Sequence, residues 1–374
     1  MTLRNKPDKP TIPKPEPKLR SDWFKNPIAK ICLALFLGVI SGFIFNWTAL
    51  PLPWMLGAMF ANIIAAVIRL PVAGPTRLRP LVAIVIGVML GSSFTPALFD
   101  QITLWAPSLV FMVFYLFVAA IVIVPYYRRV AGFDLPTAYF AGMPGGLMEM
   151  MIIGKDMGAD ERSIILAHTS RIVLVLTLVA VWFRLVQDID LSDRTQFGIP
   201  FSEIPAHELV ILAIVGAVGY FVGRFLRLPA PMLLGPILVS AAVHALGVVH
   251  NPPPRELVII AQIFLGTIVG CRFIGAEPKV ILRAIWLGLG ATTLMLALTF
   301  SFAMVLHQMF GQTLEQLVLA YSPGGLAEMS LVALAMNADI AYVASHHLVR
   351  ISFVMMMAPL IFRLFLKKEH HSPK

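Results

Sequence analysis

The chain has 374 residues, of which 58% are hydrophobic and only 13% are charged, and its formal net charge is +9. Soluble domains carry about 25% charged residues, so no single globular core would bury this much apolar surface, and a lipid bilayer is the expected solvent. The positive charges gather near the N-terminus and at the ends of apolar runs. This distribution is typical of a membrane topology signal and argues against a nucleic-acid partner.

Residues 1–26 are rich in Pro and Lys and poor in apolar side chains. This composition predicts a disordered, basic tail in the cytosol. The apolar run that follows, at 28–47, is long enough to cross a bilayer, so we expect an uncleaved first helix and not a signal peptide.

Twelve apolar runs then fill the chain, and an acidic linker at 188–206 separates them into two sets. The runs lie at about 28–47, 51–70, 80–97, 103–127, 136–154 and 162–187, and at about 207–226, 230–249, 256–274, 281–309, 314–335 and 340–366. Most are long enough for a helix crossing of about 20 residues. We therefore predict an all-α integral membrane protein with one repeat at 27–187, a second at 207–368 and a short tail at 369–374.

The second set of runs repeats the motifs of the first. The pairs are Pro53-Trp-Met-Leu-Gly57 with Pro231-Met-Leu-Leu-Gly235, Gly87-x-x-x-Gly91 with Gly266-x-x-x-Gly270, Pro144-Gly-Gly-Leu-x-Glu149-Met with Pro323-Gly-Gly-Leu-x-Glu328-Met, and His168-x-x-Arg171-Ile with His347-x-x-Arg350-Ile. One register, with shifts of 178 or 179 residues, accounts for every pair. Chance does not produce such agreement, so the sequence indicates an internal duplication.

Lys and Arg predict how the two halves are oriented. If all six runs of each half crossed, the halves would be parallel, and the basic residues at 224–227 and 272–283 would lie outside the cell. If the fifth run of each half is broken or re-entrant, each half has about five spanning helices and the halves are inverted. Nearly all Lys and Arg then lie on the cytoplasmic side with both termini, and the linker is periplasmic. We favour this inverted arrangement.

Each half contains one Pro-Gly-Gly motif within its fifth run. The residues are Pro144, Gly145 and Gly146, and Pro323, Gly324 and Gly325. Proline removes a backbone donor and glycine tolerates angles that a helix forbids, so each motif predicts a helix break. Broken helices in inverted repeats form the substrate sites of many secondary transporters. The alternative is a kink that serves packing alone.

Ionisable residues inside the apolar runs are candidates for a substrate or ion pathway. They are Glu149, His168 and Arg171 in the first half, and Glu328, His347 and Arg350 in the second. Each arginine follows a presumptive helix cap, Asp160 or Asp339, by 11 residues, which places it roughly 16 Å along its helix, about mid-bilayer. The arginines could hold a carboxylate or phosphate of a substrate. Alternatively, the glutamate and arginine of each half form an ion pair, and we expect this pairing. A lone histidine on a helix is more often a satisfied core group than a ligand.

The two Pro-Gly-Gly motifs, the aspartates that follow them and the two arginine-centred final helices together resemble the membrane AbrB-duplication family of bacteria. The resemblance covers nearly the whole chain after the tail and implies a protein of the bacterial inner (plasma) membrane with a tandem repeat. Family members are often labelled ammonia monooxygenases or regulators of gene expression. Gln is common in the family at the positions of His168 and His347, which argues against a universal role for these histidines.

The favoured function is a secondary transporter or permease for a small, anionic or zwitterionic metabolite. One alternative is a membrane protein that influences the regulation of gene expression, through solute flux. A membrane monooxygenase is less favoured because it needs a metal site, and the nine histidines form no cluster in the sequence. No metal or cofactor is expected. The expected partners are the lipid bilayer and a small-molecule substrate, and a homodimer is left open.

Overall fold

The computed structural model describes residues 26–48, 50–94, 98–185, 197–228 and 230–366, and this part of the chain contains helices and no strands. The first half forms α1 (Pro27–Phe45), α2 (Pro53–Val67), α3 (Arg79–Gly91), α4 (Leu98–Tyr126), α5 (Leu135–Gly142), α6 (Leu147–Asp156) and α7 (Glu161–Leu185). The second half forms α8 (Ala206–Phe225), α9 (Pro231–Ala245), α10 (Arg255–Gly270), α11 (Pro278–Phe310), α12 (Leu314–Tyr321), α13 (Leu326–Ala335) and α14 (Ile340–Ile361). The predicted tails at 1–25 and 369–374 lie outside the described residues, as does the first part of the linker, residues 188–196.

The predicted all-helical membrane class is confirmed. Among the described residues, seven helices are long and apolar enough to cross a membrane, namely those that contain α1, α4 and α7 in the first half and α8, α10, α11 and α14 in the second. The remaining apolar helices α2, α9 and α13 have 10 to 15 residues. At 1.5 Å per residue a 15-residue helix is only about 22 Å long, short of a bilayer core of about 30 Å. The expected five spans per half therefore include elements that do not reach across on their own.

Local sequence explains where several helices begin. The carboxylate of Asp160 accepts a hydrogen bond from the Ser163 amide at 3.0 Å, and that of Asp339 accepts one from the Tyr342 amide at 3.0 Å. The two aspartates therefore cap α7 and α14, as the sequence predicts. The hydrogen bonds that Asp160 receives from Ser163 lower the pKa of its carboxyl group below the ordinary value.

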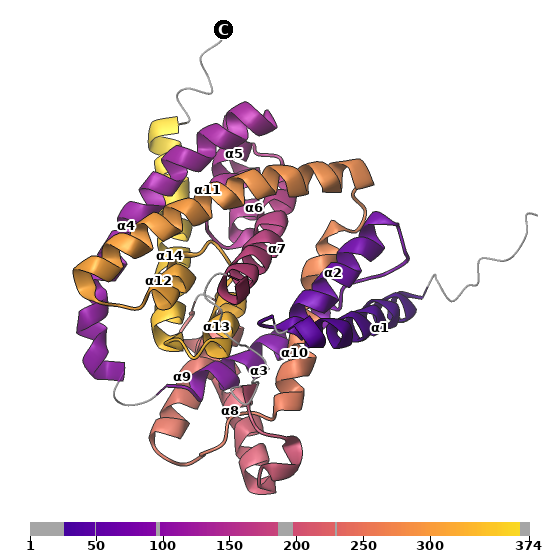
Figure 1. Cartoon of the computed structure of the whole chain (residues 1–374), viewed down its shortest axis with the longest axis vertical. Coiled ribbons are helices and arrows are strands. Elements are labelled where there is room, and N and C mark those ends of the chain that lie inside the picture. Colours follow the sequence, from indigo (N-terminus) through magenta and orange to yellow (C-terminus); the bar gives the residue numbers. More distant parts are fainter. Residues whose placement is uncertain (1–25, 49, 95–97, 186–196, 229, 367–374) are drawn as a thin grey trace, which may run out of the picture.

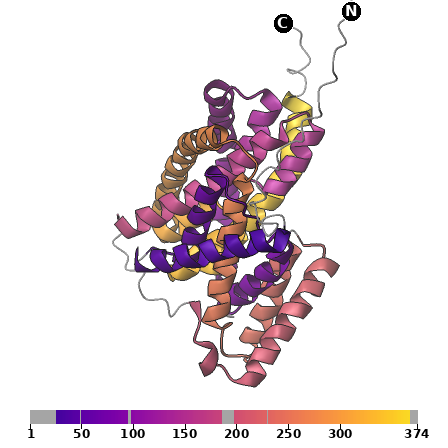
Figure 2. The same cartoon turned by 90° about the vertical axis from the view of Figure 1, so that its right-hand side faces the viewer.

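The helices pack into two bundles, each built from both halves of the chain (Figure 1). Helices α1–α3 pack with α8–α10 in what we call the glycine-packed bundle, and α4–α7 pack with α11–α14 in what we call the arginine bundle. Figure 2 shows α8 and α9 at the lower end of the molecule, opposite α5. Contacts between the bundles are fewer than those within them and are made by α13 on α3, by α2 on α7 and α11, and by the turn after α10 on α7. The spatial units of the protein therefore do not coincide with the halves of its sequence.

Glycines set the close contacts in the glycine-packed bundle. A Cβ atom at Gly266 of α10 would lie 2.1 Å from the carbonyl oxygen of Met55 in α2, and one at Gly87 of α3 would lie 2.6 Å from that of Leu233 in α9. Each pair joins one half to the other at corresponding positions of the repeated motifs. The Gly-x-x-x-Gly pairs of α3 and α10 therefore allow close helix packing.

Candidate functional site

Both Pro-Gly-Gly motifs break their helices, as predicted. The apolar run at 136–154 consists of α5 and α6, and the run at 314–335 consists of α12 and α13. Between the two short helices the backbone is extended at Met143 and Gly146 in the first half, and at Ser322 and Gly325 in the second. Each break therefore leaves the C-terminal carbonyls of one short helix and the N-terminal amides of the next without helical partners.

Arg171 binds the first break. Its guanidinium donates to the carbonyl oxygens of Ala141 at 3.4 Å and Met143 at 3.2 Å, and to Nδ1 of His168 at 3.0 Å. Its side chain comes from α7, which packs against α5 and α6, and it is only 3% exposed. The arginine therefore neutralises the negative end of α5.

Arg350 binds the second break in the same way. It donates to the carbonyl oxygens of Ser322 and Gly324, both within hydrogen-bond distance, and to Nδ1 of His347 at 3.0 Å. Its exposed fraction is 2%. The two halves thus build two equivalent centres, each with a buried arginine clamped on the carbonyls of a broken helix.

The histidines orient the arginines. Nε2 of His168 lies 2.9 Å from the carbonyl oxygen of Phe140, and Nε2 of His347 lies 3.0 Å from that of Leu319. A carbonyl oxygen only accepts, so Nε2 carries the proton and Nδ1 is left to accept from the arginine. Both rings are fully hydrogen-bonded, which favours a positioning role over direct contact with a substrate.

The expected ion pairs between glutamate and arginine are wrong. Within the described part of the chain, neither Arg171 nor Arg350 has a carboxylate in ion-pair distance. Glu149 and Glu328 instead lie in the first turns of α6 and α13. There the N-terminal amides offer a partial positive charge, while the arginines satisfy the carbonyls on the other side of each break. The short separation in sequence between each glutamate and its arginine suggested the ion pair. In the structure the ends of the short helices attract both groups, the amides the glutamate and the carbonyls the arginine.

The second glycine of each motif makes room for the glutamate. A Cβ atom at Gly146 would lie 2.0 Å from Oε2 of Glu149, and one at Gly325 would lie 2.1 Å from Oε2 of Glu328. Both glutamates are half-buried. The motif therefore does more than break the helix, because it also allows a carboxylate to fold back over the break.

The two breaks lie close to the final helices of the opposite halves. A Cβ atom at Gly145 would meet Val354 of α14 at 2.8 Å, and α13 packs on α7. Nε of each arginine is buried and has no hydrogen-bond partner. The arginine bundle therefore holds two buried cations, each with one free Nε donor.

Arg272 is a site residue that the sequence analysis did not single out. It lies in the turn after α10, its Nη1 atom is buried without a hydrogen-bond partner, and the charges of Arg79 and Glu328 both act on it. A basic residue directly after the Gly266-x-x-x-Gly270 pair was the signal that could have identified it. It places a half-buried cation of the glycine-packed bundle beside the second break.

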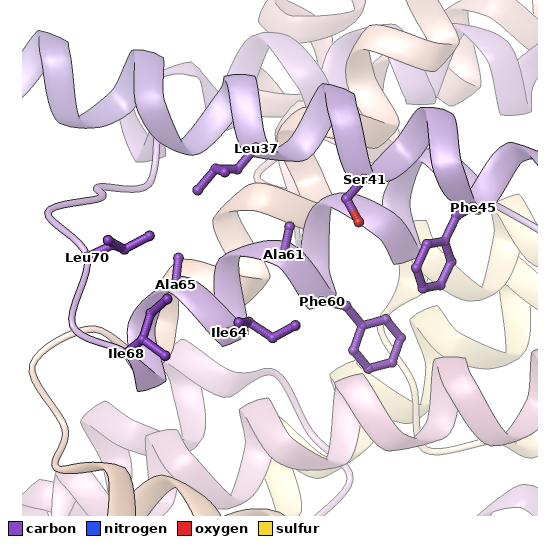
Figure 3. Close-up of a pocket in the computed structure, with 9 residues that line it drawn as sticks. All are labelled: Leu37, Ser41, Phe45, Phe60, Ala61, Ile64, Ala65, Ile68 and Leu70. Carbon is purple, nitrogen blue, oxygen red and sulfur yellow. The ribbon is translucent and has the colours of Figure 1, made fainter.

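An apolar groove of about 520 Å³ lies elsewhere, between α1 and α2 (Figure 3). It is lined by Leu37, Ser41, Phe45, Phe60, Ala61, Ile64, Ala65, Ile68 and Leu70. Ser41 supplies its one hydroxyl group and no charged side chain lines it. None of the predicted site residues reaches it, and its lining does not suit a charged metabolite.

Comparisons with known proteins identify a family and two relatives. Residues 54–366 match the family model described as "Transition state regulatory protein AbrB". A protein of Bacillus subtilis (strain 168) named "Uncharacterized protein YhjN" is 25% identical over 358 residues, which cover 90% of this chain and 92% of that protein. A protein of Escherichia coli (strain K12) named "Putative regulator AbrB" is 24% identical over 323 residues, which cover 84% of this chain and 90% of that protein.

Proposed function

The chain belongs to this AbrB family, and we propose that it is a secondary transporter for a small anionic or zwitterionic metabolite in the bacterial inner membrane. The observation that carries the proposal is the pair of buried arginines that bind helix breaks and have no carboxylate partner among the described residues. A buried cation without a counter-ion is costly, and an anion bound between the two would offset that cost. The free Nε donors suit a carboxylate or phosphate oxygen.

The two-bundle architecture supports alternating access. The candidate site lies within the arginine bundle, while the glycine-packed bundle is held together by close backbone contacts of its own. Contacts that are fewer between two rigid bundles than within them favour movement of one against the other. We propose that the arginine bundle carries the substrate and that the glycine-packed bundle is the static partner.

A ligand panel tests this proposal. We expect a mono- or dicarboxylate, an amino acid or a phosphate ester to raise the melting temperature of the purified protein, because a ligand at 100 times its Kd stabilises the folded state by about 2.7 kcal/mol. The same compound should enter proteoliposomes that contain the protein and not empty liposomes. Cationic amines of similar size serve as the matched controls. Stabilisation and uptake by amines alone would contradict the proposal.

The orientation of the protein in the membrane can be tested at the two ends of α11. This helix has 33 residues and is about 50 Å long. The exposed Gln308 and Lys279 lie near its opposite ends. In a background with Cys32→Ser, we expect Gln308→Cys to react with a membrane-impermeant thiol reagent in intact cells, and Lys279→Cys to react only after permeabilisation. The reverse pattern would contradict cytoplasmic termini.

The Escherichia coli relative is named as a regulator. For this chain we propose that an effect on gene expression would follow from a change in the cellular concentration of the transported solute. A deletion strain should then regain normal expression when the solute is supplied by an unrelated transporter, whereas a direct regulator would not be replaced in this way.

A further inference from the structure

The apolar groove between α1 and α2 has two different ends (Figure 3). The stacked rings of Phe45 and Phe60, with centroids 5.8 Å apart, lie at one end, and Ile68 lies at the other. Ile64 and Ile68 are 59% and 60% exposed, so this face of the helix pair meets the lipid phase. From Phe60 to Ile68 the groove follows α2 for about 12 Å, close to the depth of one leaflet, about 15 Å.

Two basic residues lie at the Ile68 end of the groove. Arg69 is exposed and stands between two of the lining residues, in the turn directly after α2. Lys30 precedes the lining residue Leu37 by seven positions, or about two helical turns, and therefore lies on the same face of α1. The Ala73 amide donates to the Lys30 carbonyl oxygen at 3.2 Å, which brings the turn after α2 to the start of α1. Within the described residues neither cation makes an ion pair.

The backbone conformation of Arg69 is one that favours glycine. Arg69 has φ of 59°, and its amide donates to the Ala66 carbonyl oxygen at 3.1 Å to close the turn. The turn after α9 is closed in the same way by Gly247, which has φ of 68° and stands at the corresponding position of the second half. A left-handed conformation is unfavourable for a residue with a Cβ atom and costs glycine little. The first half therefore carries an arginine where the repeated turn accepts glycine, which indicates a role for the guanidinium itself.

The charge of this region suits an anion and not a second cationic surface. Residues 23–99, which include α1, α2 and α3, contain Lys and Arg but no Asp or Glu. A two-fold contact between two copies of this face would bury Arg69 and Lys30 of both copies without an acidic partner from these helices. An anionic occupant would neutralise them.

The apolar lining and the two cations together select the kind of occupant. Acyl chains are as apolar as the side chains of the groove, so contact with the groove alone does not distinguish one lipid from another. The head group makes the distinction, because Lys and Arg at the membrane surface attract anionic lipids. With the N-terminus of α1 on the cytoplasmic side, the basic end of the groove lies in the cytoplasmic leaflet.

We propose that this groove is a binding site for one anionic phospholipid of the cytoplasmic leaflet. One acyl chain lies between α1 and α2 and reaches toward Phe45 and Phe60, and the phosphate lies at Arg69 and Lys30. A zwitterionic phospholipid also carries a phosphate, but its own ammonium group would lie beside the same cations. The site belongs to the glycine-packed bundle and does not depend on the proposed transport function.

Lipid titration of the purified full-length protein tests the site without a transport substrate. Native mass spectrometry in neutral detergent counts bound lipids as phosphatidylglycerol or phosphatidylcholine is added. We expect the first phosphatidylglycerol to bind at least ten-fold more tightly than phosphatidylcholine. Arg69→Gln should weaken binding of phosphatidylglycerol about five-fold, since one basic residue near the surface contributes about 1 kcal/mol, and should leave phosphatidylcholine unchanged.

Arg227→Gln is the matched control for the charge. Arg227 is also an exposed arginine with a left-handed backbone, φ of 51°, and it follows α8, which does not line the groove. Its replacement should leave the affinity for phosphatidylglycerol unchanged. Equal losses in Arg69→Gln and Arg227→Gln would show general attraction to a basic surface and would overturn the site.

A second pair of variants tests the acyl-chain groove. Ile64→Trp places a large side chain in the groove and should weaken the first binding step of both lipids several-fold, whereas Ile121→Trp, at a 72% exposed position of α4, should not. Equal melting temperatures of the two variants show that the fold is intact.

The remaining outcomes would overturn the proposal. Equal affinities of the wild type for the two lipids would remove the head-group selection. A dimer that retains no lipid and that Ile64→Trp converts to a monomer would assign the groove to a second copy of the chain. Failure of every transport assay would leave the lipid site untouched, because none of these measurements uses a transported solute.

Discussion

Replacing Arg350 with alanine is expected to lower the free energy of unfolding by about 3 kcal/mol or more, since three buried acceptors lose their donor and each unsatisfied group costs about 1–3 kcal/mol. These acceptors are the carbonyl oxygens of Ser322 and Gly324 and Nδ1 of His347. Thermal melting of the detergent-solubilised protein measures the loss. Arg171→Ala should behave similarly, because Arg171 also donates to two carbonyl oxygens and a histidine ring.

The matched control is Arg224→Ala, which removes an exposed arginine bonded to the Tyr220 hydroxyl and should change stability by less than about 0.5 kcal/mol. Adding Glu328→Gln to Arg350→Ala should give additive losses, because the two side chains are not paired. Recovery of stability in this double variant would restore the ion-pair interpretation and contradict the observed capping.

The second large effect is expected at the glycines of the glycine-packed bundle. A Cβ atom at Gly235 would lie 2.0 Å from the carbonyl oxygen of Gly219, and one at Gly266 would lie 2.1 Å from that of Met55. Backbone atoms cannot move aside as easily as the end of a side chain. Gly235→Val and Gly266→Val should therefore each lower the free energy of unfolding by about 3 kcal/mol or more and reduce the amount of folded protein. Size-exclusion chromatography and melting curves provide the measurement.

Gly142→Ala is the control for these substitutions, because the nearest atom to the added methyl group is a side-chain carbon of Ile123 at 3.3 Å. Its loss should be clearly smaller than that of either valine variant. Equal losses at all three positions would show that the close backbone contacts between helices do not limit stability.

Sequence reasoning succeeded where the determinant is local. The pyrrolidine ring of Pro144 and the glycines after it dictate a helix break whatever surrounds them, and the carboxylate of Asp160 reaches an amide three residues away. It failed where the partner is a backbone atom. The carbonyl oxygens of Ala141 and Met143 carry no signature in the sequence. Arg171 was therefore paired with the carboxylate of Glu149, which lies within an apolar run as Arg171 does.

Sequence reasoning also could not predict the division of the helices into two bundles. The repeats suggested two units in chain order, but α2 packs on α10 and α3 packs on α9. The long apolar run at 51–70 also predicted a full crossing, whereas α2 ends at Val67 and Arg69 adopts a left-handed conformation with φ of 59°. Pairing across the two halves and the exact end of a helix depend on contacts that composition does not encode.

The exchange of partners between halves has a consequence for synthesis in the cell. The backbone of Met55 meets Gly266 only after about 210 further residues have been made, which takes roughly 10–40 s at translation rates of 5–20 residues per second. Throughout that interval the faces of α2 and α3 that later pack against α10 and α9 have no partner helix. A nascent chain that stops at the linker lacks α8–α14 and can complete neither bundle. Only the full-length chain can therefore bury the interhelical faces of both bundles.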